Sequence, residues 1–216
     1  MEKIRHHLTE ELLMGYAAGT LPEAFSLVVA SHVSMCDTCR AAVETYDMIG
    51  GVLLDEASSE MSPDSLEAAL ARLSDHDHNI EKTGTGANPD AVLPAPLRDY
   101  VGGDVDAIRW RSVGGGVKQA ILPTSKDASA RLLLIPAGSA VPDHGHRGME
   151  LTMVLTGAFE DETDRFARGD VEVATEDLDH MPVADIGADC ICLAATDAPL
   201  RFNSWIPRLA QPFLRI

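Results

Sequence analysis

The chain has 216 residues, 45% of them hydrophobic, and a formal net charge of −17. This length allows one large domain or two small ones, and the composition is typical of a globular rather than a disordered protein. Residues 1–90 hold 5 Lys and Arg against 16 Asp and Glu. Such an acidic surface repels nucleic-acid phosphates and attracts a basic partner, so we expect no direct DNA binding.

The N-terminus, MEKIRHHLTEELL, lacks the apolar core of a secretory signal peptide. No run approaches the roughly 18 apolar residues of a membrane span. We therefore expect a cytoplasmic protein without a membrane anchor. Because the cytosol keeps thiols reduced, the four cysteines are expected to be metal ligands, reactive thiols or core residues rather than disulfides.

About four helices are predicted in the first eighty residues. Thr9 is a suitable N-cap for EELLMGYAAG, Leu8 and Leu13 have the spacing of a hydrophobic staple, and Gly19 can end this helix. Pro22 suits the first turn of the next helix. One face of that second helix is formed by Phe25, Val28, Val29 and His32.

A third helix follows from Arg40 to Glu56, and we expect it to be broken or loosened at Gly50 and Gly51. Ser62 and Pro63 cap a fourth helix. Its leucines share one face at helical spacing, and they are Leu66, Leu70 and Leu73.

A composition change between Ser74 and Pro96, rich in Gly, Pro, Asn and Asp, predicts a domain boundary. We expect a helical domain at 1–85, a linker at 86–96 and a second domain at 97–216. Short apolar runs separated by turn residues predict that the second domain is a closed β-barrel or sandwich. The runs are AIRWRSV, VKQAILP, ARLLLIPAG, ELTMVLTGAFEDE, DVEVATE, CICLAAT and LRFNSW.

The first candidate site is the spacing His-x3-Cys-x2-Cys formed by His32, Cys36 and Cys39. Two thiolates and an imidazole suit zinc, which takes a fourth ligand in a closed tetrahedral site. His6 and His7 are both candidates for that ligand; His7 is closer to the helix entry, but the sequence leaves the choice open. A redox pair or two inert buried thiols are the alternatives. A thioredoxin-type pair is expected in a βαβ setting, whereas these cysteines lie between helices.

The second candidate site is the spacing G-x5-H-x-H-x3-E-x6-G from Gly138 to Gly157. On a strand, His144 and His146 would project to one face, and Glu150 could reach them from the neighbouring strand. A fourth ligand is expected from His180. Two histidines and a carboxylate suit Zn, Fe, Mn or Ni. The alternative is histidines on an exposed loop of a barrel without metal.

Two more cysteines, Cys190 and Cys192, lie in the run CICLAAT and share one face of a strand. They are either small core residues or thiols that respond to an oxidant.

These motifs resemble two known families. Residues 1–85 resemble the zinc-binding anti-sigma domain, which implies a structural zinc held by His7, His32, Cys36 and Cys39. The second spacing matches the first cupin motif at every position. Gly169 and His180 resemble the second cupin motif, although Thr175 and Asp177 stand where Pro and Gly are usual.

The whole chain, and especially LLMGYAAGTLPEAFSLVVASHVSMCDTCR, resembles the ChrR-type anti-sigma factors. This resemblance implies a small helical zinc-binding bundle followed by a cupin β-barrel, with a metal in each. It implies no catalysis. The implied activity is to hold an extracytoplasmic-function (group IV) sigma factor inactive until singlet oxygen or an organic hydroperoxide is sensed through the cupin.

Two alternatives stay open. The chain could be a metal-dependent cupin oxygenase with a helical oligomerisation module, although no further acid or base is evident in the barrel sequence. It could also be a redox switch at Cys36 and Cys39, in which mild oxidation expels zinc and then the partner.

Overall fold

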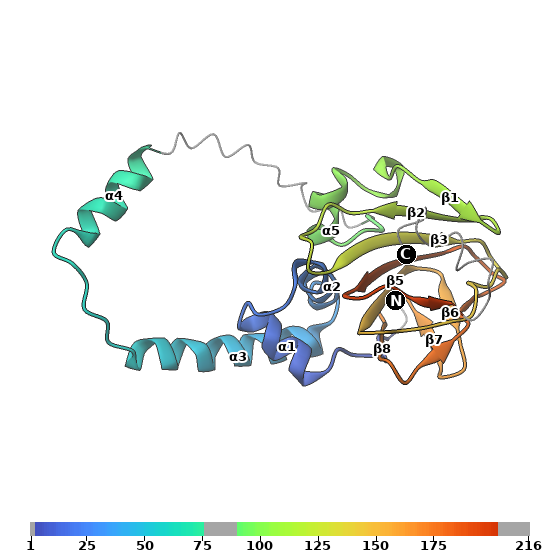
Figure 1. Ribbon diagram of the computed structural model, residues 1–216, viewed down its shortest axis with the longest axis horizontal. Coiled ribbons are helices and arrows are strands. Elements are labelled where there is room, and N and C mark those ends of the chain that lie inside the picture. The colour runs from blue at the N-terminus through green and yellow to red at the C-terminus, as the bar shows by residue number, and fades with distance from the viewer. Residues whose placement is uncertain (1–2, 76–89, 203–216) are drawn as a thin grey trace.

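The structure is a computed structural model that describes residues 3–75 and 90–202. Helices come first along the chain and strands follow (Figure 1). The helices are α1 (Glu10–Ala17), α2 (Glu23–Val33), α3 (Asp37–Glu56), α4 (Ser65–Asp75), α5 (Ala95–Val101) and the 3-10 helix η1 (Val105–Ala107). The predicted class, a helical part followed by a cupin barrel, is confirmed. Residues 76–89 of the predicted boundary and the end of the LRFNSW run lie outside the described residues.

All strand pairs in the described residues are antiparallel and form three sheets. The large sheet has the order β1-β2-β3-β11-β5-β8, and the small sheets have the orders β10-β6-β7 and β12-β4-β9. The strands are β1 (Arg111–Gly114), β2 (Val117–Ile121), β3 (Ser129–Ile135), β4 (His144–Gly145), β5 (Glu150–Thr156), β6 (Ala158–Glu160), β7 (Arg165–Ala167), β8 (Val171–Ala174), β9 (Asp179–His180), β10 (Val183–Ala184), β11 (Cys190–Thr196) and β12 (Arg201–Phe202).

The first two helices begin and end where the sequence predicts. The Thr9 side chain accepts a hydrogen bond from the Leu12 amide, and Gly19 follows α1 with φ +66. Glycine tolerates this left-handed conformation better than other residues, which explains why the helix ends there. Pro22 immediately precedes α2. The predicted α2 face is buried, which confirms it.

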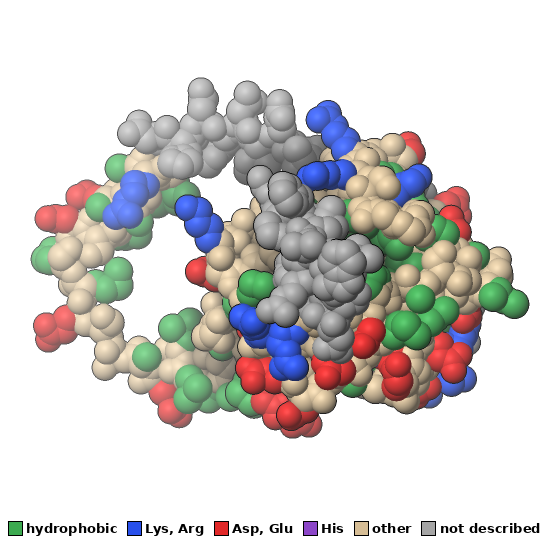
Figure 2. Space-filling model, turned by 45° about the vertical axis from the view of Figure 1, so that its right-hand side comes forward, with side chains coloured by type: hydrophobic (Ala, Val, Ile, Leu, Met, Phe, Trp, Pro, Cys, Tyr) green, Lys and Arg blue, Asp and Glu red, His purple; other side chains and the backbone are tan. Residues whose placement is uncertain are grey.

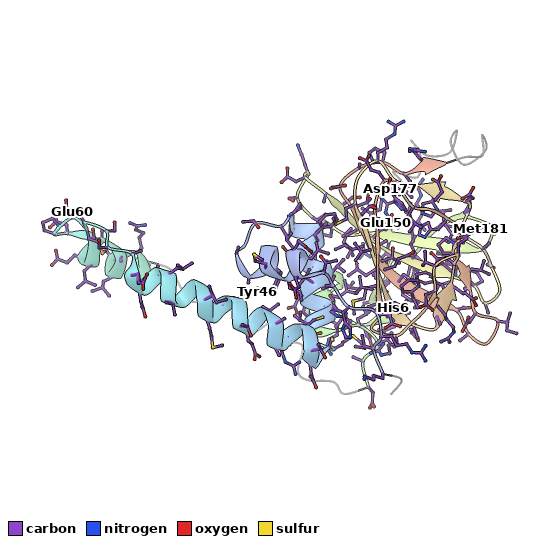
Figure 3. All side chains as sticks on the ribbon, turned by 90° about the horizontal axis from the view of Figure 1, so that it is seen from below. His6, Tyr46, Glu60, Glu150, Asp177 and Met181 are labelled. Atoms are coloured by element: carbon purple, nitrogen blue, oxygen red, sulfur yellow. The ribbon has the colours of Figure 1, made fainter. Side chains whose placement is uncertain are left out.

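The predicted interruption at Gly50 and Gly51 is wrong, because α3 runs unbroken through both residues. A glycine costs a helix only about 1 kcal/mol relative to alanine, which weakens the helix but does not force a break. The continuous helix extends away from the barrel beyond Tyr46, and the chain turns near Glu60 toward α4 (Figure 3). We call residues 47–75 the arm.

The inner strands of the large sheet are buried on both faces, as β11 shows. Ile191, Leu193 and Ala195 pack in the cluster that contains the helices, whereas Cys190 and Cys192 point into the barrel. Helix α2 packs on the outer face, against β11 and β5. Burial on both faces accounts for the continuous apolar run CICLAAT. The helices and the barrel therefore share one hydrophobic core.

In the described part of the chain, no helix is both long enough and apolar enough to cross a membrane.

Candidate metal centres

Four side chains from three places in the chain form the N-terminal cluster. His7 precedes α1, His32 lies in the last turn of α2, and Cys36 and Cys39 lie at the start of α3. His7 Nδ1 is 3.3 Å from Cys36 Sγ and 3.5 Å from Cys39 Sγ. His32 Nε2 is 3.2 Å from Cys39 Sγ. One ligand atom of each residue lies within 4.8 Å of the others, so the whole predicted set is brought together.

The protonation of His32 suits a metal ligand. Its Nδ1 lies 2.9 Å from the carbonyl oxygen of Gly169. A carbonyl only accepts, so Nδ1 carries the hydrogen and Nε2 presents a lone pair to the cluster. Burial lowers the pKa of His32 to about 4, which keeps the ring neutral. Burial raises the pKa of Cys39 to about 11, so a cation bound there would displace the thiol proton.

His6, the other candidate ligand, faces the barrel instead. Its Nε2 lies 3.2 Å from Asp164 Oδ2 and its Nδ1 lies 3.4 Å from Asp170 Oδ2. The ring also packs on Phe166 with 4.4 Å between centroids. The structure thus separates two adjacent histidines that the sequence left as alternatives: His7 joins the cluster and His6 contacts the cupin.

The barrel contains the second cluster. His180 Nε2 is 3.2 Å from His144 Nε2 and 3.3 Å from His146 Nε2. Glu150 Oε2 is 4.0 Å from His146 Nδ1. The four predicted residues offer ligand atoms within 4.8 Å of one another, and all four are buried. His146 lies past the end of β4, because pairing of β4 with β9 stops at Gly145.

In two of these histidines, a hydrogen bond at Nδ1 fixes the tautomer. Nδ1 of His144 is 2.9 Å from the carbonyl oxygen of Pro142, and Nδ1 of His180 faces Asp161 at 2.9 Å and Glu172 at 3.0 Å. Both Nδ1 atoms therefore donate, which leaves both Nε2 lone pairs directed at the same point. Two such lone pairs 3.2 Å apart repel unless a proton or a cation lies between them. The donor set fits a metal.

Asp161 and Glu172 extend this cluster beyond the predicted residues. Burial lowers the pKa of His180, but hydrogen bonds to Glu172 and Asp161 outweigh it and raise the pKa to about 9. Burial raises the pKa of Glu172 to about 7. Neither residue stands out in the sequence. Glu172 lies between Val171 and Val173, and alternation assigns the valines rather than the glutamate to the barrel interior.

A cavity of about 320 Å³ opens beside the second cluster. Its lining is mainly apolar and includes Val113, Val117, Leu133, Ile135, Val141 and Phe159. One end is polar, where His144, Glu150 and His180 meet the buried side chains of Gln119 and Arg131. A space of this size and lining suits a small organic molecule.

Cys190 and Cys192 share one face of β11, as predicted, and their Sγ atoms lie 3.4 Å apart. Cys192 lines the cavity. Its hydrogen bond to Cys190 and its burial raise the pKa of Cys192 well above the usual thiol value. Cys192 is therefore a thiol in the barrel interior rather than a thiolate.

The fold and the two clusters define a cupin protein with an N-terminal helical unit that carries its own Cys/His cluster. The family model of the ChrR cupin-like domain matches residues 99–198. The chain is 59% identical over 214 residues, 99% of each chain, to the anti-sigma-E factor ChrR of Cereibacter sphaeroides. It belongs to the ChrR family of anti-sigma factors.

A solved structure agrees with this assignment. The crystal structure of Rhodobacter sphaeroides SigE in complex with the anti-sigma ChrR is similar to this chain with a TM-score of 0.78 and 56% sequence identity. The similarity covers 90% of this chain and 100% of the matched chain. It therefore extends over the helical part as well as the barrel.

Proposed function

We propose that this protein binds and inhibits a group IV sigma factor and releases it when an oxidative signal reaches the cupin. Membership of the ChrR family supports the first part, because the related crystal structure is a complex of SigE with ChrR. The protein acts in this proposal as a regulator, and binding rather than turnover is its activity.

The observation that carries the proposal is the apolar surface of the arm. Nine large hydrophobic side chains of the arm are 53% to 75% exposed. They are Met48, Ile49, Val52, Leu53, Leu54, Met61, Leu66, Leu70 and Leu73. Surfaces of this kind mark protein–protein contacts in chains that are otherwise well packed.

The charge of the arm favours a basic partner. Acidic residues are interspersed with the apolar ones along it, namely Asp47, Asp55, Glu56, Glu60, Asp64, Glu67 and Asp75. Figure 2 shows hydrophobic and acidic side chains side by side on this part of the surface. An apolar centre with an acidic rim suits a sigma factor whose surface is basic, because the rim steers association and the centre supplies affinity.

The two clusters take different roles in the proposal. His7, His32, Cys36 and Cys39 would hold a structural zinc, since two thiolates and two imidazoles form a closed tetrahedral set. That zinc would join the segment before α1 to α2 and α3. His144, His146, Glu150 and His180 would hold a second metal, which leaves room for an additional ligand from the cavity.

The signal is proposed to arrive at the barrel. The cavity reaches His144, His180 and Cys192, so a small oxidant or organic hydroperoxide could contact the metal ligands and a thiol at once. Release then requires only that the signal change the relative free energies of the bound and free forms by a few kcal/mol.

Co-expression with Rhodobacter sphaeroides SigE, followed by metal analysis of the purified protein, tests the proposal. We expect a stoichiometric complex in which the anti-sigma chain carries two metal ions, one of them zinc. Failure to co-purify would contradict the sigma-binding role. Oxygen-dependent turnover of a small molecule, without any complex, would favour a cupin oxygenase instead.

A further inference from the structure

Residues 169–172 connect the two candidate metal centres. At one end, the carbonyl oxygen of Gly169 accepts a hydrogen bond from His32 Nδ1 at 2.9 Å. At the other end, Glu172 Oε1 accepts one from His180 Nδ1 at 3.0 Å. In both histidines, the bonded nitrogen is the one that faces away from the cluster, and Nε2 faces into it. We call residues 169–172 the connecting segment.

The connecting segment is held firmly over its whole length. The Gly169 amide donates to the Val154 carbonyl at 2.8 Å, and the Val171 amide donates to the His6 carbonyl at 3.2 Å. Asp170 is 2% exposed. Its carboxylate accepts from the backbone amides of Arg5, His6 and Ala167 at 2.7, 3.0 and 2.9 Å. A movement at one end is therefore not easily absorbed between the ends.

Gly169 has a conformation that other residues adopt only with strain. Its φ is +91, and a Cβ built on it would lie 2.7 Å from Ile4 Cδ1. This close approach brings the segment before His7 against the connecting segment. The barrel thus reaches the N-terminal cluster in two ways. It contacts the ligand His32 directly, and it contacts residues 4–6, which come just before the ligand His7.

We propose that the connecting segment positions one histidine of each cluster and so couples the two metal sites. Glu172 is a positioning residue for His180, and the Gly169 carbonyl is one for His32. Filling the barrel site favours the segment position that also holds His32 toward Cys39, so each site binds its metal more tightly when the other is filled. Reciprocity follows from thermodynamic linkage. The coupling itself does not depend on the proposed function. Its consequence does: the coupling would transmit a signal from the barrel to the sigma-binding helices.

Cobalt(II) in place of the native metal provides the readout. Thiolate-to-cobalt charge transfer reports on Cys36 and Cys39, so the loss of cobalt from the N-terminal cluster to a chelator can be followed in the full chain. We expect His144→Ala, which removes a barrel ligand outside the connecting segment, to speed this loss about 5-fold or more. Glu172→Ala should have a similar effect, although Glu172 is not in the N-terminal cluster.

The double variant decides whether the connecting segment carries the coupling. If it does, His144→Ala with Glu172→Ala loses cobalt no faster than the faster single variant, because both changes remove the same interaction. Multiplicative effects, or no effect of His144→Ala, would overturn the proposal. Glu176→Ala, exposed just beyond β8, is the control and should match the unaltered chain.

Two further measurements keep the test independent of folding and of the sigma factor. Thermal unfolding of each variant detects a general loss of structure, and Glu172→Met, which has a similar side-chain length but cannot accept the hydrogen bond from His180, replaces Glu172→Ala if that variant does not fold. SigE binding is measured separately. A chain that binds SigE but shows no coupling overturns this inference alone, whereas coupling without SigE binding overturns the proposed function alone.

Discussion

His6 and His7 are adjacent in the sequence but belong to different parts of the molecule. His7 Nδ1 lies 3.3 Å from Cys36 Sγ, whereas His6 Nε2 lies 3.2 Å from Asp164 Oδ2 in the barrel. Two consecutive residues thus connect the N-terminal cluster to the cupin barrel.

This separation predicts different effects of two matched substitutions. His7→Ala should remove one zinc equivalent from the purified protein, because a tetrahedral site that loses a ligand binds its metal much more weakly. His6→Ala should keep that zinc. Metal analysis of both variants is the measurement, and zinc loss from His6→Ala with retention in His7→Ala would contradict the assignment.

The arm should supply most of the sigma-binding free energy. Leu54→Glu and Leu70→Glu place charges on its apolar surface, where the side chains are 75% and 54% exposed. Truncation of an interface hot spot costs ~2 kcal/mol or more, about 30-fold in Kd. We expect losses of that size for SigE with little change in stability.

Ile186→Glu is the matched control, because Ile186 is 91% exposed but lies on the barrel. Its affinity for SigE should equal that of the unaltered chain. Equal losses for the arm and barrel variants, measured by titration calorimetry, would argue against the arm as the binding surface.

Asp170 should stabilise the attachment of residues 4–8 to the barrel. Asp170→Asn puts an amide group among three backbone donors, and an unsatisfied buried donor costs about 1–3 kcal/mol. We expect a loss of that size in the free energy of unfolding and faster hydrogen exchange at the amides of Arg5 and His6. Asp164→Asn is the control. It also faces His6, but its side chain is 59% exposed, so its cost should be smaller.

The contribution of Asp170 should depend on pH. Burial alone would raise the pKa of Asp170, but hydrogen bonds from the backbone amides of His6, Ala167 and Arg5 outweigh it and lower the pKa. A lowered folded pKa stabilises the protein above the unfolded value of about 3.9, and this stabilisation is lost as pH falls through the folded pKa. The free energies of unfolding of the unaltered chain and of Asp170→Asn, measured with urea, should therefore approach each other as the pH falls below about 4. A difference between them that does not change with pH would contradict an ionised Asp170 in the folded protein.

The barrel cluster should be needed for the response rather than for repression. His144→Ala leaves the arm and the four N-terminal ligands in place, so SigE binding should persist when zinc is in excess, while induction by singlet oxygen or an organic hydroperoxide is lost. Cys192→Ser tests the predicted thiol response in the same reporter strain. Full induction in both variants would place the signal elsewhere in the protein.

The residues that lie together in each cluster can be picked out from the sequence because metal ligands have strict spacing. His32, Cys36 and Cys39 lie within eight residues, and one helix end and one helix start suffice to bring them together. The choice between His6 and His7 depends on a contact with the barrel more than a hundred residues away. No local pattern contains that information.

Other features are missed for similar physical reasons. The continuity of α3 at Gly50 and Gly51 depends on a balance of small propensities, which a glycine pair shifts without reversing. Glu172 contacts His180 from β8, where Val171, Glu172 and Ala174 are all buried, so alternation does not identify the inward face. Composition changes along the chain also do not predict that the helices and the barrel share one hydrophobic core.

Inhibition of sigma-dependent transcription tests the proposed anti-sigma role most directly. RNA polymerase core enzyme, SigE and a SigE-dependent promoter should yield transcript that falls as the full chain is added, reaching a minimum at one chain per sigma factor. The Leu70→Glu variant should inhibit only at much higher concentration. Undiminished transcription at an excess of the unaltered, metal-loaded chain would contradict the anti-sigma role.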